Sequence, residues 1–172
     1  DAANHVVKSI HEAGHNAQAV EIDVCDDAKL AGVLDQVVTG HGSLDGVVNA
    51  TFAYTNVPFD QMSLDDWRDG LRVNLDAAFL VAREAGRIMN AQGHGSIVQF
   101  SSMYGVVAPH PELYEGMPVN PVHYGVAKAG VLQLVKYQAA IMGPAGVRVN
   151  AIIPGPFPFK SLQDTDPRFI ER

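Results

Sequence analysis

The sequence has 172 residues, enough for about one domain, and its 47% hydrophobic and 18% charged residues are typical of a globular protein with a core. Its formal net charge of −7, without any basic run, argues against a nucleic-acid binder, and no apolar stretch approaches the roughly 20 residues of a membrane span. The first residues lack a signal-peptide pattern and the single cysteine, Cys25, excludes an internal disulfide, so we expect a soluble, cytoplasmic protein.

The first fifty residues predict two helices and two strands. Apolar side chains at helical spacing predict a helix over 2–13, and the β-branched run AVEIDV predicts a strand over 19–24. Asp26 is a typical N-cap for a helix that stops before Gly40. The run LDGVVN predicts a second strand over 44–49.

A long helical region comes next in the chain. Ser63-Leu-Asp-Asp66 resembles a capping box, with Asp in place of the usual Glu, and begins a helix that extends to about Ala91. Gly70 and Asn74 lie inside this region and indicate a break between two helices. The run SIVQF then predicts a third strand over 96–100.

The last third of the chain predicts a long loop, a helix and a strand. The loop over 104–120 holds several prolines and is long for a compact domain, which is typical of a functional segment. Asn120 is a good N-cap and Pro121 a good first residue for a helix that ends near Met142. A fourth strand is predicted over 147–153.

This alternation of helices and strands predicts an α/β fold, a single domain over 1–172 with a doubly wound, Rossmann-like parallel sheet. In such sheets the ligand binds beyond the carboxyl ends of the strands. Polar or turn residues follow the predicted strands at these ends, namely Asp23, Asn49, Ser102 and Pro154-Gly155. Their common edge is therefore the predicted ligand site.

Tyr124 and Lys128 lie four residues apart on a predicted helix and share one of its faces. An ammonium beside a phenol favours the phenolate. A phenol tuned in this way can act as a general acid or base on an alcohol or a carbonyl. Taken alone, the pair is equally compatible with an ordinary surface contact.

Together these segments resemble the short-chain dehydrogenase/reductase family. The matching pieces occur in the family's order and cover essentially the whole chain: Asp23-Val24, Val48-Asn49, Val73-Asn74-Leu75, Ile97 to Ser102, Tyr124 to Lys128 and Arg148 to Gly155. The resemblance implies a fold that binds NAD or NADP and an enzyme that interconverts a small-molecule alcohol and a ketone. It also implies a homodimer or homotetramer, built on the long helix and the helix of Tyr124.

The resemblance implies a role for each matching residue. Tyr124 would be the catalytic acid/base, Lys128 would favour its phenolate and bind the nicotinamide ribose, and Ser102 would hydrogen-bond the substrate oxygen. Asn74 would organise a proton relay through water to Lys128, although it could also merely break a helix. The cofactor would be contacted by Asp23, Val24, Asn49, Ala50, Tyr124, Lys128, Pro154 and Gly155. Asp23 is also compatible with a plain capping role.

The chain departs from the family pattern in three places. The family's first strand, Gly-rich turn and second strand would precede Asp1, which leaves the strand over 19–24 without a neighbour, so we expect this sequence to be part of a longer chain. Asn-Ala-Thr-Phe52 replaces Asn-Asn-Ala-Gly, which would change the pocket near the nicotinamide. The loop over 109–118 lengthens the gap between Ser102 and Tyr124, and it resembles a loop of a subgroup associated with sugar metabolism.

The sequence thus predicts an NAD(P)-dependent oxidoreductase for a secondary alcohol or ketone, with a sugar-derived compound as a candidate substrate. The alternative is a non-catalytic protein that kept the fold for binding or as a scaffold. A serine hydrolase is disfavoured because the sequence has no Gly-x-Ser-x-Gly elbow. His11 and His15 lie four residues apart without a third ligand nearby, which favours solvated histidines over a metal site, so we expect no metal.

Overall fold

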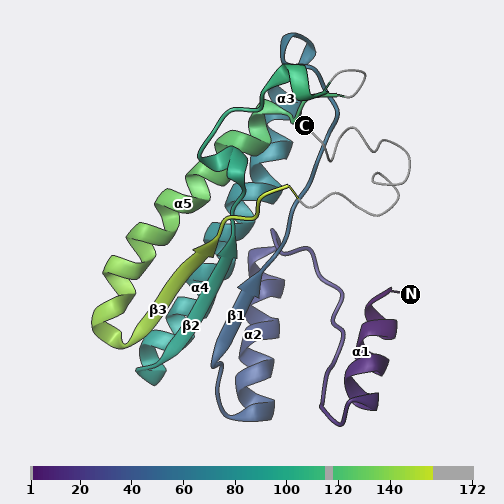
Figure 1. Ribbon diagram of the computed structural model, residues 1–172. Coiled ribbons are helices and arrows are strands. Elements are labelled where there is room, and N and C mark those ends of the chain that lie inside the picture. Colours follow the sequence, from purple (N-terminus) through teal and green to yellow (C-terminus); the bar gives the residue numbers. More distant parts are fainter. Residues whose placement is uncertain (1, 115–117, 157–172) are drawn as a thin grey trace.

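A computed structural model of the chain describes residues 2–114 and 118–156. In these residues three parallel strands form a sheet in the order β1 (Gly46–Asn49), β2 (Gly95–Phe100) and β3 (Val147–Ile152) (Figure 1). The register pairs Val48 with Val98, and Val98 in turn with Asn150. Because neighbouring strands are parallel, their carboxyl ends meet at one edge of the sheet.

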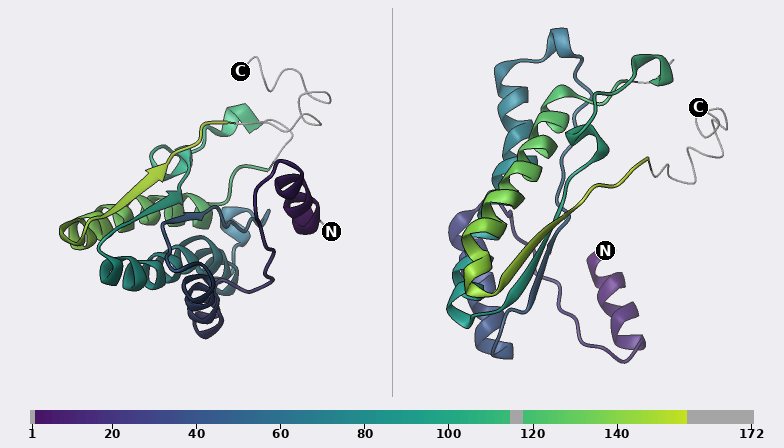
Figure 2. Two further views of the ribbon diagram at one scale, coloured as in Figure 1. Left: turned by 90° about the horizontal axis from the view of Figure 1, so that it is seen from below. Right: turned by 60° about the vertical axis from the view of Figure 1, so that its left-hand side comes forward.

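Three long helices cover one face of this sheet (Figures 1 and 2). They are α2 (Asp27–His41), α4 (Ala77–Gln92) and α5 (Val122–Met142). The core between them and the sheet is apolar, and the side chains of Met89, Ile97, Val131 and Val147 are almost fully buried. A parallel sheet with crossover helices is the α/β, Rossmann-like architecture that the sequence predicts, here as a partial sheet.

The predicted break in the long helical region is real and has a defined geometry. The helix α3 (Leu64–Leu71) continues into a π-helical turn, η2 (Arg72–Asp76), before α4 begins. A π-turn inside a helix is uncommon and is frequently found at functional sites. Asn74 lies in the middle of this turn and is buried.

The helix-capping predictions hold at two starts and fail at a third. The side chain of Asp26 accepts a hydrogen bond from the backbone of Lys29, and both halves of the Ser63–Asp66 capping box are formed. Asn120 is not an N-cap, however. Pro121 takes that position because its backbone is extended, with φ −67° and ψ 143°, so that α5 begins one residue later than predicted.

The strand predicted over 19–24 is wrong. These residues follow α1 (Ala2–Glu12), which stands apart from the sheet and buries none of its residues (Figure 2). Within the described ranges no strand pairs with 19–24, and a β-branched sequence becomes a strand only when its backbone groups find a partner.

The loop over 104–120 is divided by two short 3-10 turns, Met103–Gly105 and Pro111–Tyr114, and its residues 115–117 lie outside the described ranges. Across the described residues, no helix combines the length and apolarity needed to cross a membrane.

Candidate functional site

The carboxyl ends of the three strands converge beside the first turns of α5 (Figure 1). Asn49 is the last residue of β1, and Ser101 and Ser102 follow β2 directly. The backbone N–H of Ser101 donates to the carbonyl of Ile152 at 2.9 Å, and that of Met103 donates to Pro154 at 3.1 Å. These bonds continue the pairing of β2 with the chain after β3, and they fix Ser102 at the edge.

Lys128 reaches this edge from the second turn of α5. Its side chain is buried, and its ammonium donates to the carbonyl oxygen of Phe100 at 2.9 Å, with a longer contact of 3.5 Å to that of Thr51. Burial lowers the pKa of Lys128 from 10.5 to about 8, because the charged form is poorly solvated. The two carbonyls use at most two of the three N–H groups of the ammonium, which leaves one for a further acceptor.

Tyr124 lies one turn before Lys128 on α5 and is half-buried. The Lys128 ammonium nitrogen lies 5.6 Å from the centroid of the Tyr124 ring. Tyr54 also meets the Tyr124 ring edge-on, with 6.5 Å between the centroids and 73° between the planes. The sequence prediction that Tyr124 and Lys128 share a helix face is therefore confirmed.

Ser102 and Ser101 have different environments. The hydroxyl oxygen of Ser102 accepts from the backbone N–H of Tyr104 at 3.2 Å, so its own proton is not used in that bond. The hydroxyl of Ser101 donates to the carbonyl of Lys128 at 2.8 Å and so ties β2 to α5. Of the two serines, Ser102 is the one with a proton available to a ligand oxygen.

Asn74 is buried and bonds the loop after β1 to the π-turn. Its side-chain amide donates to the carbonyl of Gly70 at 2.9 Å and to that of Ala53 at 2.8 Å, while its oxygen accepts from the backbone N–H of Ala53 at 3.2 Å. Gly70 is four residues earlier, the partner that a regular α-helix would give to the backbone N–H of Asn74. The side chain thus replaces a backbone bond and holds the loop as well.

Asn49 belongs to a series of buried side-chain hydrogen bonds next to the site. Its amide donates to the side-chain oxygen of Gln99 at 2.8 Å, and Gln99 in turn donates to the carbonyl of Ala78 at 2.9 Å. The side-chain oxygen of Asn49 accepts from the backbone and the hydroxyl of Thr51. This series of hydrogen bonds links β1, β2 and α4, and it fixes the point at which the loop after β1 begins.

Asp23 does not lie at a strand end, because residues 19–24 form no strand. Its carboxylate accepts from the backbone N–H of Cys25 at 2.9 Å and pairs with Arg72 at 3.3 Å, and these interactions lower the pKa of Asp23. Val24 is half-buried beside it, and Ala50 is exposed after β1. Pro154 and Gly155, in contrast, follow β3 at the same edge as Ser102.

The loop of residues 51–55 is the part of the site that sequence reasoning missed. Thr51 accepts from Lys128, Ala53 is bonded on both its N–H and its carbonyl to Asn74, and the Tyr54 ring meets Tyr124. The aromatic residues of this loop were a weak signal. Phe52, which we expected to reshape a pocket, is 65% exposed.

A separate cavity of about 720 Å³ lies beside the long loop. It is lined largely by apolar residues of 56–59, 104–109 and 118–122, together with Val126 and Ala129 of α5. None of the side chains of Ser102, Tyr124 and Lys128 is among the residues that line it. Among the described residues, no cluster of three or more His, Cys, Asp or Glu side chains could hold a metal ion.

Comparisons with known proteins all find dehydrogenases or reductases. A family model described as enoyl-(acyl carrier protein) reductase matches residues 1–169. A cis-4-hydroxycyclohexanecarboxylate dehydrogenase of Sinomonas cyclohexanicum is 34% identical over 156 residues, which are 90% of this chain and 59% of that protein. The chain thus spans about three fifths of the length of this relative.

Two solved structures have the same arrangement. A gluconate 5-dehydrogenase of Burkholderia cenocepacia, in complex with NADP and tartrate, is 28% identical with a TM-score of 0.81, covering 96% of this chain and 62% of that chain. An NAD⁺-bound xylitol dehydrogenase is 30% identical with a TM-score of 0.82, covering 95% of this chain and 60% of that chain.

Proposed function

This chain belongs to the short-chain dehydrogenase/reductase family, and on that premise we propose that the whole protein is an NAD(P)-dependent oxidoreductase that interconverts a secondary alcohol and a ketone. The observation that carries the proposal is that Lys128, with Tyr124 beside it, and Ser102 all lie at the carboxyl edge of the parallel sheet. This is the edge where ligands of doubly wound folds bind.

The residues present fit the nicotinamide half of the cofactor. The spare N–H of the buried Lys128 ammonium is a donor suited to a ribose hydroxyl, and Pro154 and Gly155 extend from the strand edge beside it. A bound nicotinamide supplies the carbon that accepts or gives the hydride. Asn49 and Ala50 would border the same edge from β1.

The adenine half would lie near Asp23 and Val24. The Asp23 carboxylate is already bound to Cys25 and Arg72, so it is oriented before any ligand arrives. A carboxylate with a lowered pKa stays ionised at neutral pH and accepts hydrogen bonds from hydroxyl or amine groups.

Residues of this chain would bind the substrate oxygen and exchange its proton. Ser102 donates a hydrogen bond that orients this oxygen, and Tyr124 takes the hydroxyl proton during oxidation or returns it during reduction. The positive charge of Lys128 stabilises the tyrosinate, which accepts the alcohol proton during oxidation and forms when Tyr124 gives up its proton during reduction. Asn74 holds the π-turn and the loop of residues 51–55, and it would order the water through which the proton leaves toward Lys128.

We propose a small-molecule substrate, with polyols and cyclic hydroxy acids as the first classes to test. The relatives reported above include dehydrogenases named for xylitol, gluconate and a hydroxycyclohexanecarboxylate. A sugar-derived compound falls within this range. The cytoplasm is the proposed location, because the reaction draws on the cell's nicotinamide pool.

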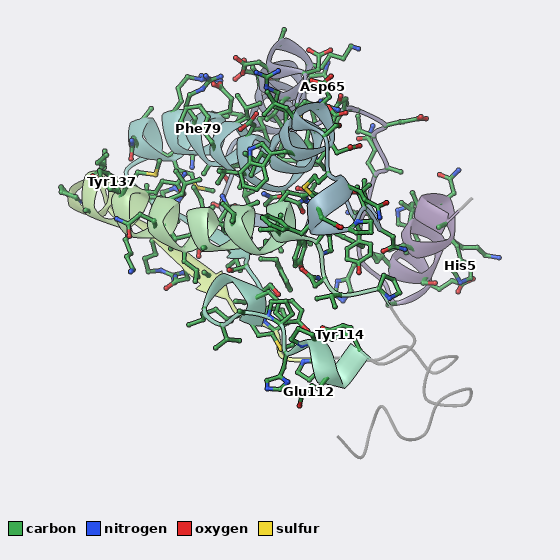
Figure 3. All side chains as sticks on the ribbon, turned by 90° about the horizontal axis from the view of Figure 1, so that it is seen from above. His5, Asp65, Phe79, Glu112, Tyr114 and Tyr137 are labelled. Carbon is green, nitrogen blue, oxygen red and sulfur yellow. The ribbon has the colours of Figure 1, made fainter. Side chains whose placement is uncertain are left out.

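We also propose a homodimer or homotetramer. Apolar side chains project from the outer sides of two neighbouring helices, with Phe79 of α4 46% exposed and Tyr137 and Ile141 of α5 63% and 69% exposed (Figure 3). These exposed side chains are candidates for burial in an interface between subunits. Light scattering of the whole protein measures the state directly.

The test of the proposed function is an assay of the whole protein with NAD⁺ and with NADP⁺ against polyols, cyclic hydroxy acids and aliphatic secondary alcohols. Reduction of the nicotinamide, followed at its own absorbance band, supports the proposal. Saturable binding of NADH or NADPH without turnover on any substrate would instead support a non-catalytic binding protein, and absence of binding would reject both.

A further inference from the structure

The imidazole of His123 is a buried group for which the proposed reaction has no use. Its side chain is fully buried between α3, α5 and the loop of residues 51–55. A Cβ on Gly70 would lie 2.3 Å from the ring, so the imidazole packs directly on the α3 backbone where only glycine fits. One ring nitrogen, Nε2, lies 2.8 Å from the hydroxyl oxygen of Thr55.

The other ring nitrogen, Nδ1, is buried and has no hydrogen-bond partner among the described residues. A buried N–H without an acceptor is more costly than a buried lone pair without a donor. The proton of the neutral ring therefore belongs on Nε2, where it is donated to Thr55. Burial also lowers the pKa of His123, against a weaker opposite effect of the Asp66 carboxylate on α3.

Thr55 connects this imidazole to the site. The preceding residue, Tyr54, presents its ring edge-on to Tyr124, and Ala53 is held by Asn74. Asn74 thus fixes the loop of residues 51–55 at Ala53, and His123 fixes it at Thr55. Tyr54 lies between these two fixed residues, and its ring contacts the Tyr124 ring edge-on.

We propose that His123 is a positioning residue, whose Nε2–H holds Thr55 and thereby sets the direction of the Tyr124 ring through Tyr54. The proposal rests on the proposed function, since it concerns the residue given the acid/base role. The proposed role of His123 requires no contact with substrate or cofactor. It acts through two side chains of the loop.

Two pairs of variants test this role in the whole protein. Thr55→Val keeps the shape of the side chain but removes the acceptor, whereas Thr55→Ser keeps a hydroxyl. His123→Leu removes the donor, whereas His123→Gln places an amide N–H near the position of Nε2. We expect kcat to fall about tenfold in Thr55→Val and His123→Leu with the KM of the dinucleotide within about twofold, because misorientation of the acid/base acts on the chemical step.

The conservative variants, Thr55→Ser and His123→Gln, are expected to stay within about threefold of the wild-type kcat. Wild-type kcat in Thr55→Val would overturn the proposal. An equal loss in all four variants would also overturn it, since that pattern indicates packing alone. Thr55→Val is the decisive variant if His123→Leu does not fold.

A second measurement does not depend on turnover. Spectra of protein with ¹⁵N-labelled histidine report which ring nitrogen carries the proton, and ring signals of labelled tyrosine, assigned with Tyr124→Phe, report the surroundings of Tyr124. We expect a neutral Nε2–H tautomer at pH 7 and a shifted Tyr124 signal in Thr55→Val but not in Thr55→Ser. An Nδ1–H tautomer or an unmoved Tyr124 signal would overturn the positioning role. Absence of turnover with these spectra as expected would reject the proposed function and leave the His123 anchor standing.

Discussion

The ammonium of Lys128 lies 2.9 Å from the carbonyl oxygen of Phe100, the last residue of β2. This contact places a charged group at the end of the central strand of the sheet, in a setting that excludes most water. It joins residues 28 positions apart in the chain. Keeping that charge buried costs free energy, and this cost depends on pH.

We expect the wild-type protein to gain stability, relative to Lys128→Met, as the pH rises from about 8 to 10.5. Burial lowers the pKa of Lys128 from 10.5 to about 8, so in this window the unfolded chain holds a proton that the folded chain has released. Folding is then favoured by rising pH, by up to about 3 kcal/mol across the window. Urea unfolding of both proteins at several pH values measures the difference. A difference that stays constant with pH would show that the Lys128 pKa is not lowered.

Tyr124→Phe is expected to reduce kcat by roughly 10²- to 10⁴-fold, because it removes the only proton that the ring can exchange. The ring itself and its contact with Tyr54 remain, so the unfolding temperature should change little. Steady-state turnover together with thermal unfolding separates the two effects. Tyr137→Phe, on the same helix but far from the carboxyl edge of the sheet, is the matched control, because it also removes one phenol hydroxyl and keeps the ring. Wild-type turnover in Tyr124→Phe would refute the acid/base role.

Asn74→Leu is expected to destabilise the protein by about 2–4 kcal/mol, because it leaves the N–H and carbonyl of Ala53 and the carbonyl of Gly70 without their partner. Asn90→Leu, on the exposed side of α4, is the matched control and should change stability by less than about 0.5 kcal/mol. Denaturant unfolding gives both values. Equal effects of the two substitutions would mean that the Asn74 bonds add nothing to stability.

Gly105→Ala is expected to lower both stability and turnover. Its Cβ would lie 2.8 Å from the carbonyl carbon of Lys128 and 2.9 Å from the nitrogen of Ala129, so the turn after Ser102 has to move away from α5. Gly32→Ala, in α2 with no heavy atom within 4 Å of the new Cβ, should instead stabilise by about 0.5–1 kcal/mol. Turnover and unfolding of the two variants give a direct comparison. A turnover in Gly105→Ala equal to that of Gly32→Ala would contradict the close approach.

The local features of this chain were readable from short stretches of sequence. The capping box of Ser63 and Asp66 depends on residues three apart, and the shared face of Tyr124 and Lys128 depends on the helical repeat alone. The strands over 44–49, 96–100 and 147–153 were found within two residues of their observed bounds, since apolar β-branched runs bury well in a parallel sheet. The predicted break near Asn74 was also correct.

The strand predicted over 19–24 was wrong because strand pairing is not a local property of the sequence. Its composition favours a strand, but composition does not supply a partner for the backbone, and the described residues offer none. The predicted start of α5 was wrong for a related reason. Asn120 suits an N-cap in isolation, yet the extended backbone of Pro121 sets the first helical residue.

By itself, the sequence determined the three strands of the sheet, the place of Asn49, Ser102 and Pro154 at their carboxyl ends and the shared helix face of Tyr124 and Lys128, because each depends on side-chain type and on spacing within one element. Only the tertiary structure decided how the loop of residues 51–55 is held by Lys128, Asn74 and His123. Those bonds join residues 21 to 77 positions apart. Their partners are fixed by the packing of helices on the sheet, and no local pattern of residues encodes that packing.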